Sequence, residues 1–257
     1  MQSKIQIHDV ELFVDILTTI SNFSEACKLE LCKDKPFSVY LKNSISRIHL
    51  ESNVCTTDSL EPISISFDKL NKLICPLTAI MDSSKQQKLP IELTFDGNKL
   101  SYSGTLISFL LLGVKDEIIS SSIDRPIQIE LQTLCNFCVE QNVISRILSN
   151  SSTIVDSENI QYKLSIDEIK QKMVYIEATS AATKLTNSFK QHLGNVISGT
   201  FSDKLNLDEK RLILIKQLNS TVNISVTSKN VLIIQSEKKL DDLYSKFEVY
   251  TSILKEQ

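Results

Sequence analysis

The sequence has no tryptophan and few glycines, and these shortages exclude some classes of site. Only 5 of the 257 residues are glycine, so the glycine-rich loops that cradle nucleotide phosphates are not expected. No apolar run approaches the roughly 18–20 residues that a membrane-spanning helix requires. The first residues, MQSKIQIHDVELF, lack the layout of a signal peptide. We therefore expect an intracellular protein with no membrane partner.

The sequence also lacks a recognisable catalytic or metal-binding motif. Cys135 and Cys138 form a CxxC, but no second pair of ligands follows at the spacing of a zinc site. No serine lies in a GxSxG turn, and the six cysteines follow no disulfide framework, which indicates reduced thiols. We expect no catalytic residue, no metal and no cofactor. Cys135 and Cys138 are interpreted as core residues of a helix.

Composition and charge are those of a soluble globular protein. Hydrophobic residues make up 42% of the chain and charged residues 23%, with a net charge of −3. Any surface that binds DNA must therefore be a local basic patch on an acidic body. Heavy use of Ile, Lys, Ser and Asn is typical of an AT-rich genome and favours a viral source.

Residues 114–126, VKDEIISSSIDRP, are polar at the centre, apolar at both ends and closed by a proline. We interpret them as a connector between two similar domains, over residues 1–113 and 127–257, because the sequence on either side repeats itself. A chain of alternating strands also resembles itself in part, and that alternative stays open. Three pairs of segments match in the same order: residues 5–7 with 127–129, 63–71 with 197–206, and 91–102 with 222–233.

Apolar spacing in the first half predicts two helices and a series of strands. Residues 10–21 have helical periodicity, with Asp9 as the N-cap. A second helix is predicted over residues 68–77, where Pro76 ends or kinks it. Asp96-Gly97-Asn98 is a predicted hairpin turn. The expected strands cover residues 4–9, 29–31, 39–41, 48–51, 63–67, 91–95, 100–103 and 105–114.

The second half is predicted to follow the same order. Its helices are expected over residues 131–148 and 204–218. Its strands are expected over residues 127–130, 153–155, 162–166, 173–178, 196–201, 222–226, 231–235 and within 244–254. Each domain then contains two βαβββ units, which is an α+β fold. Every helix has a single apolar face, so the helices should lie on one face of antiparallel sheets.

This order of elements resembles the DNA sliding clamps, the ring-shaped processivity factors of replication found as proliferating cell nuclear antigen and in T-even phages. The segment ISISFDKLNKL, residues 63–73, is similar to the strand that leads into the second helix of a clamp domain. Residues 222–254 are similar to the closing three strands. The resemblance extends over nearly the whole chain and implies a non-enzymatic clamp that encircles DNA as a homotrimer of six domains.

The partners that the resemblance implies are double-stranded DNA, bound without sequence specificity, a DNA polymerase and a clamp loader. They would meet at replication sites, in the nucleus or cytoplasm, or in the host cytoplasm for a viral protein. The helices would line a hole, with cations facing phosphates. The helix over residues 10–21 departs from this pattern, because it carries Glu11 and Asp15 but no cation. An ordinary solvated helix face is the alternative explanation for these cations. The residues that the resemblance implies as DNA contacts are Lys69, Lys72, Arg146, Lys204, Lys210, Arg211 and Lys216.

The resemblance also implies a docking groove for partner tails under the connector and beside the C-terminus. Alternatively, Ile118 and Ile119 only pin the connector to its own domain. Other functions stay open: a subunit of a heteromeric checkpoint-type clamp, a clamp adapted to transcription, or an α+β binding protein or enzyme with an unrecognised site. The implied docking residues are Val39, Leu41, Val114, Ile118, Ile119, Val249 and Tyr250.

Overall fold

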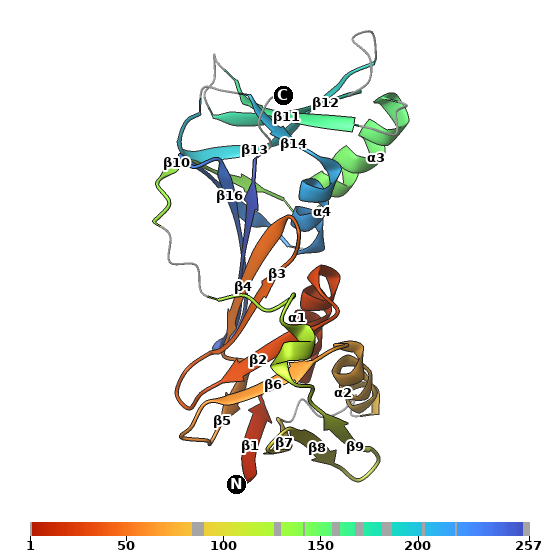
Figure 1. Cartoon of the computed structure of the whole chain (residues 1–257). Helices are drawn as coiled ribbons and strands as arrows, with labels where there is room; N and C mark the ends of the chain where they lie inside the picture. The colour runs from red at the N-terminus through yellow and green to blue at the C-terminus, as the bar shows by residue number, and fades with distance from the viewer. Residues whose placement is uncertain are drawn as a thin grey trace. The chain divides into compact units, whose positions relative to one another are not determined.

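The chain forms two compact units in the computed structural model (Figure 1). Unit 1 consists of Met1–Pro126 with Glu237–Phe247, and unit 2 of Ile127–Ser236 with Glu248–Gln257. Residues 237–247, expected in the second domain, are thus grouped with unit 1. The structure describes residues 2–83, 90–125, 130–140, 142–155, 160–167, 172–180, 187–201, 204–218 and 220–253.

Unit 1 follows the predicted order of two βαβββ units, with one extra short strand, β5, and a 3-10 helix, η1, after the last strand. Its sheets are antiparallel and run in the orders β5-β1-β7-β8-β9 and β4-β3-β2-β6. The helices α1 and α2 pack against each other (Figure 1). The elements are β1 Gln2–Ile7, α1 Val10–Phe23, β2 Cys27–Leu31, β3 Phe37–Lys42, β4 Ser46–Ser52, β5 Cys55–Thr57, β6 Ile63–Phe67, α2 Asn71–Ser83, β7 Ile91–Asp96, β8 Lys99–Ser103, β9 Ser108–Leu112 and η1 Asp116–Ile119.

The first helix forms where the sequence predicts it. The side chain of Asp9 caps α1 by accepting a hydrogen bond of 2.8 Å from the backbone N–H of Leu12, so the predicted N-cap is confirmed. One face of the helix is buried, and Phe13, Ile16 and Ile20 lie on it. The local signals of cap and periodicity agree with the final packing.

The second helix begins at Asn71 and continues through Pro76 to Ser83, so of the two predicted effects of Pro76, an end or a kink, the end is wrong. A proline inside a helix removes one backbone hydrogen bond and crowds the preceding turn. Leu73 before Pro76, and Leu77 and Ile80 after it, are all buried. Their burial stabilises the helix on both sides of the proline and offsets the lost bond.

The predicted hairpin turn joins β7 to β8. Gly97 adopts a positive φ of 66° there, which a glycine tolerates without the steric cost that other residues incur. The register pairs Asp96 with Lys99 and Phe95 with Leu100. The turn sequence therefore sets both the position and the register of this hairpin.

Unit 2 consists of two βαβββ units without an added strand, and α3 packs against α4 (Figure 1). Its strands are antiparallel, in the order β14-β11-β12-β13-β10-β15-β16. The elements are β10 Thr133–Val139, α3 Val143–Val155, β11 Ile160–Ile166, β12 Met173–Ser180, β13 Phe189–Gly199, β14 Leu205–Leu207, α4 Glu209–Gln217, β15 Val222–Thr227, β16 Val231–Leu240 and β17 Leu243–Ser252.

The element boundaries expected in unit 2 need correction. Residues 131–148 are not one helix, because Thr133–Val139 is strand β10, which buries Cys135, Phe137 and Val139 at period two. The predicted strand over residues 153–155 is the last turn of α3. The helix expected from residue 204 begins at Glu209, after β14 and the N-cap Asp208. Of the strand expected over residues 127–130, residues 127–129 lie outside the described residues.

These corrections also change the alignment of the two halves. The hairpin β7–β8 corresponds to β15–β16, as the matched segments predict. Residues 63–67 form β6, whose counterpart before α4 is β14, whereas residues 197–199 end β13. The match of residues 63–71 with 197–206 therefore pairs different elements, although the order of elements does repeat.

Strand β13 changes partner along its length. Residues 189–195 pair with β12, and residues 195–199 pair with β10. Gly194 lies at the change, where a Cβ atom would stand 2.0 Å from the carbonyl oxygen of Cys138. Only glycine permits this close approach of two backbones.

Candidate nucleic-acid interface

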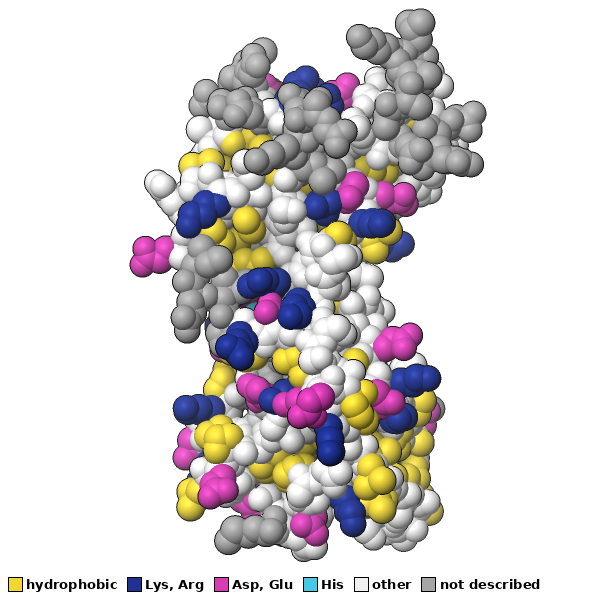
Figure 2. Space-filling model, in the orientation of Figure 1, with side chains coloured by type: hydrophobic (Ala, Val, Ile, Leu, Met, Phe, Trp, Pro, Cys, Tyr) yellow, Lys and Arg dark blue, Asp and Glu magenta, His cyan; other side chains and the backbone are white. Residues whose placement is uncertain are grey.

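The surface carries charges of both signs. Figure 2 shows basic and acidic side chains interspersed over the face drawn, rather than gathered into one basic patch. This distribution agrees with the net charge of −3. An interface for an anionic polymer must therefore be sought on individual helices.

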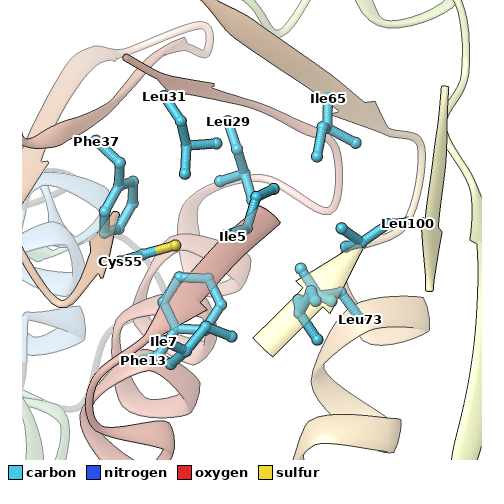
Figure 3. A pocket seen from close by; sticks show the side chains of 11 residues that line it. Ile5, Ile7, Phe13, Leu29, Leu31, Phe37, Cys55, Ile65, Leu73 and Leu100 are labelled. Carbon is cyan, nitrogen blue, oxygen red and sulfur yellow. The ribbon is translucent and has the colours of Figure 1, made fainter. Parts of the chain in front are cut away.

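A small void lies in the core of unit 1 (Figure 3). Its lining is apolar and includes Ile5, Phe13, Phe37, Cys55 and Leu73. Its volume of about 10 Å³ is that of a single water at most. Burial raises the pKa of the Cys55 thiol above its ordinary value, which keeps it protonated and unreactive. The void is a packing gap and is too small for a substrate.

The solvent faces of the unit 2 helices carry exposed cations. Arg146 lies on α3, and Lys210 and Lys216 lie on α4, all three exposed. Lys204 is also exposed but precedes β14 and belongs to no helix. Four of the predicted DNA-contacting residues in this unit are therefore accessible to a ligand.

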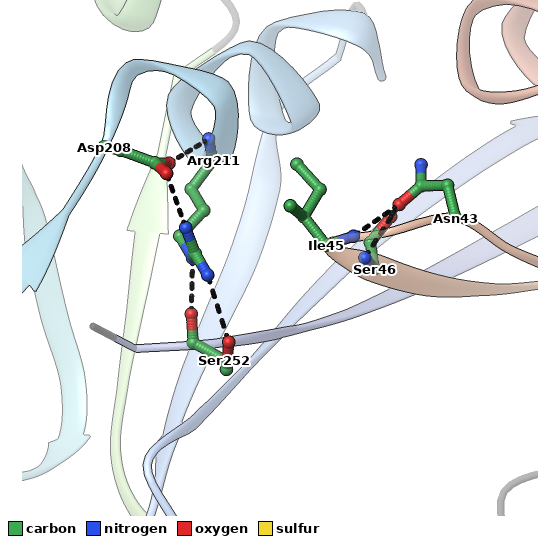
Figure 4. A network of polar contacts seen from close by, with 6 residues as sticks. All are labelled: Asn43, Ile45, Ser46, Asp208, Arg211 and Ser252. Atoms are coloured by element: carbon green, nitrogen blue, oxygen red, sulfur yellow. Dashed lines mark hydrogen bonds and ion pairs between the residues drawn. The ribbon is translucent and has the colours of Figure 1, made fainter. Parts of the chain in front are cut away.

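Arg211, the fifth predicted contact in unit 2, is instead buried, with 6% of its surface exposed. Its guanidinium pairs with Asp208 at 2.6 Å and donates hydrogen bonds to the carbonyl oxygen and the hydroxyl of Ser252 (Figure 4). It joins the start of α4 to the end of β17. The missed signal is the spacing of Leu214, Ile215 and Leu218 after Arg211, which places the arginine on the apolar face of α4.

The helix surface of unit 1 differs, because its cations have acidic partners. Lys72 contacts both carboxylate oxygens of Asp68, at 2.8 and 3.0 Å. The hydrogen bond from Lys72 is the main cause that lowers the pKa of the Asp68 carboxyl. On α1, Asp15 pairs with Lys238. Lys69 is exposed just before α2.

The connector is bound to unit 1 through its backbone. The N–H of Val114 donates to the carbonyl oxygen of Ser66 at 2.8 Å, which joins the connector to β6. Further along, Lys42 donates to Ser122 at 2.9 Å, and Asp124 donates to Tyr40 at 3.0 Å. Ile123 thus forms an antiparallel bridge with Leu41 of β3.

Ion pairs add to this attachment. Asp116 accepts hydrogen bonds from Lys28 Nζ, at 2.8 Å, and from the hydroxyl of Ser66. The bond from Lys28 and then that from Ser66 lower the pKa of the Asp116 carboxyl. Arg47 lies 3.4 Å from a carboxylate oxygen of Asp124. Both ends of the connector are therefore tied to the sheet of unit 1.

The predicted docking residues differ in accessibility. Ile118 is 66% exposed, whereas its neighbour Ile119 is buried and anchors η1. Val114 is half-buried. Val39 and Leu41 on β3 are core residues of unit 1, fully covered in the described structure. In unit 2, Val249 is buried and Tyr250 is half-buried.

An exposed apolar sheet edge is a feature that sequence reasoning did not recognise as a site. Strand β9 is the last in its sheet order, and Leu110 and Leu112 are 63% and 59% exposed. An apolar strand with an unpaired backbone edge favours association with another strand. The signal in the sequence is the run SFLLL, which is apolar on both faces of the strand.

All six cysteines are free, and Cys135 and Cys138 lie on strand β10 rather than on a helix, with Cys135 buried and Cys138 half-buried. In the described residues, no group of three His, Cys, Asp or Glu side chains is arranged to hold a metal ion. None of the helices described is both long and apolar enough to cross a membrane.

The paired βαβββ units, with helices packed together beside antiparallel sheets, define the DNA clamp fold. Solved structures of proliferating cell nuclear antigen (PCNA) share this fold over their whole length. PCNA from Entamoeba histolytica matches with a TM-score of 0.72 and 15% identity, over 98% of this chain and 99% of that one. PCNA of A. fulgidus, in a structure with the C-terminal region of FEN-1 bound, matches with a TM-score of 0.67 and 13% identity over 100% of both chains.

Sequence comparisons find no such relatives. No protein-family profile matches the chain, and no curated protein sequence matches it. At 13–15% identity the likeness to PCNA establishes the fold alone and assigns no role to individual side chains of this chain.

Proposed function

We propose that the protein is a sliding clamp, a non-enzymatic processivity factor that encircles duplex DNA and tethers a DNA polymerase and other replication proteins. The observation that carries the proposal is the full-length match to the clamp fold, with two βαβββ pairs in one chain. Exposed cations on helices support phosphate contacts without base recognition. Replication sites in the cell, or in an infected host cell, would be its place of action.

Assembly into a ring is supported by two complementary strand edges. In unit 1, residues 243–247 of β17 lie beside β4, where Tyr244 N donates to the Asn53 side chain at 2.7 Å. The elements of the two units correspond in order. In this correspondence β13 takes the place of β4, and β9, the last strand of the first two βαβββ units, takes the place of β17. Residues 189–194 of β13 pair on one side with β12, and no described strand lies on the other.

Pairing of β9 from one copy with β13 of the next would cover both edges and bury Leu110 and Leu112. Such a head-to-tail contact is heterologous, so repeated copies close into a ring when the rotation permits. We propose a homotrimer of six units, which a clamp loader would open around DNA. A heteromeric clamp uses the same edges with different chains.

The connector is the proposed docking place for partner tails. Ile118 offers an exposed apolar side chain on η1, and the connector after η1 is held beside β3 through backbone hydrogen bonds of Ser122 and Asp124. A partner segment would bury Ile118 as an apolar anchor and add backbone hydrogen bonds to the connector. Val39, Leu41 and Ile119 would support the site from the core rather than touch the partner.

Light scattering after size-exclusion chromatography tests the proposal directly. A homotrimer has a mass of about 87 kDa, three times the 29.0 kDa of the chain. Negative-stain electron microscopy should then show particles with a central hole. A protein that stays monomeric at all concentrations would contradict the homotrimeric clamp, and assembly only with related chains would favour the heteromeric one.

A further inference from the structure

We infer that the charge that holds DNA lies on unit 2 alone. In this inference Arg146 on α3 and Lys210 and Lys216 on α4 contact phosphates, while the helix surface of unit 1 contributes no net attraction. It rests on the proposed clamp function and adds which half of the chain binds the duplex.

The first observation is that acidic residues balance the cations on the helix side of unit 1. Helix α1 contains Glu11 and Asp15 but no Lys or Arg. The cations near these helices, Lys72 and Lys238, are held by Asp68 and Asp15. A cation in a close ion pair presents a dipole rather than a net charge, so it attracts a phosphate only weakly.

The one unpaired cation beside these helices in the described part of unit 1 is Lys69. It is exposed, but so are the carboxylates of Glu11 on α1 and Asp82 on α2. Acidic residues thus outnumber cations on this helix surface once Asp68 and Asp15 are matched to their partners. Repulsion from the remaining carboxylates offsets the attraction of Lys69 for phosphates.

The second observation is that the cations of unit 2 are not neutralised. Helix α3 has no acidic residue, and its exposed side carries Arg146 among neutral polar side chains such as Ser149 and Asn150, with Asn142 just before the helix. No described carboxylate lies within ion-pair distance of Arg146, and its nearest polar partner is the Asn142 side chain at 3.5 Å. Arg146 is free to meet a phosphate.

Helix α4 provides the other two cations. Lys210 and Lys216 are exposed, and neither pairs with a described acidic residue. The one acidic residue of this helix, Glu209, lies in the first turn, and the two exposed cations outnumber it. Arg211 is excluded, because its guanidinium is satisfied by Asp208 and Ser252.

The inference predicts that the two units contribute unequally to the salt dependence of the affinity for DNA. Each phosphate neutralised by a cation adds about 0.9 to the slope of log affinity against log salt concentration. Removal of the three unit 2 cations should lower that slope by about 2–3. Removal of the charges on the helix side of unit 1 should leave it nearly unchanged.

The experiment compares two triple variants with the full-length wild type. One carries Arg146→Gln, Lys210→Gln and Lys216→Gln. The matched control carries Lys69→Gln, Lys72→Gln and Asp68→Asn, which removes the ion pair together with the unpaired lysine. Affinity for a fluorescently labelled linear duplex of about 30 base pairs is measured by anisotropy at several salt concentrations. Circular dichroism checks that these surface changes leave the fold intact.

We expect the slope of log affinity against log salt concentration to be smaller than that of the wild type by about 2–3 for the unit 2 variant and by less than about 0.5 for the unit 1 variant. Equal losses from the two variants, or a greater loss from unit 1, would overturn the inference but leave the clamp function standing. Absence of duplex binding by the wild type at the lowest salt concentration would also overturn the inference, whereas the clamp function is tested separately by the oligomeric state and the central hole.

Discussion

Replacement of Arg211 tests whether this residue acts in folding rather than in DNA binding. Arg211→Ala removes the ion pair with Asp208 and the hydrogen bonds to Ser252. A hydrogen bond to a charged group contributes about 1.5–3 kcal/mol, and removal of one partner leaves the other without its bond. The side chain of Asp208 is 36% exposed, so water compensates for part of the loss. We expect the free energy of unfolding to fall by about 3 kcal/mol.

Urea denaturation followed by circular dichroism measures this change, and hydrogen exchange localises it. Exchange should increase in α4 and in residues 248–253, which the guanidinium joins. Lys210→Ala is the matched control, because it removes a neighbouring but exposed cation, and it should change stability by less than about 0.5 kcal/mol. Arg211→Lys keeps the charge but loses the planar fork, so it should fall between the two. A stable Arg211→Ala variant with a reduced salt slope for DNA would refute the structural role.

Two further predictions concern the strand edge and the connector. Leu110→Asp places a charge on the exposed face of β9 and should convert the proposed trimer to monomers by light scattering. Leu60→Asp, in a loop position that is more exposed than Leu110, should leave the mass unchanged. A trimeric Leu110→Asp would exclude pairing through β9. The pKa of Asp116 is lower in the folded protein, so its stabilising effect is present above the ordinary carboxyl pKa of about 3.9 and lost as pH falls through the folded value. Asp116→Asn should therefore destabilise the protein at neutral pH and flatten the loss of stability between about pH 5 and pH 2; a pH profile parallel to the wild type would show that the bonds to Lys28 and Ser66 do not stabilise the connector.

The proposed division of DNA contacts also bears on how the clamp would hold its duplex. A ring needs no tight contact to retain closed DNA, since encirclement prevents dissociation. Weak attraction from half of the helices would lower the friction of sliding while still keeping the duplex near unit 2. The low basic content of α1 and α2 is consistent with function by topology.

Local signals determined much of the fold. Asp9 and the periodicity that follows it specify α1, and Asp96-Gly97-Asn98 specifies the β7–β8 hairpin, because both depend on residues within one turn of each other. The repeated order of strands and helices was enough to predict the clamp fold and its candidate cations. The exposure of Lys210 and Lys216 also follows from helical spacing.

The tertiary structure alone decided the features that depend on distant residues. Thr133–Val139 has apolar residues that suit either period, and pairing with β13 and β15 makes it a strand. Arg211 and Lys210 are neighbours in sequence, yet Arg211 alone reaches Ser252 at the end of β17, in addition to its local partner Asp208. Whether a cation is free or paired depends on carboxylates brought near by folding, as Asp15 is to Lys238. The sequence lists the charges, and the packing of distant segments determines which of them remain available to DNA.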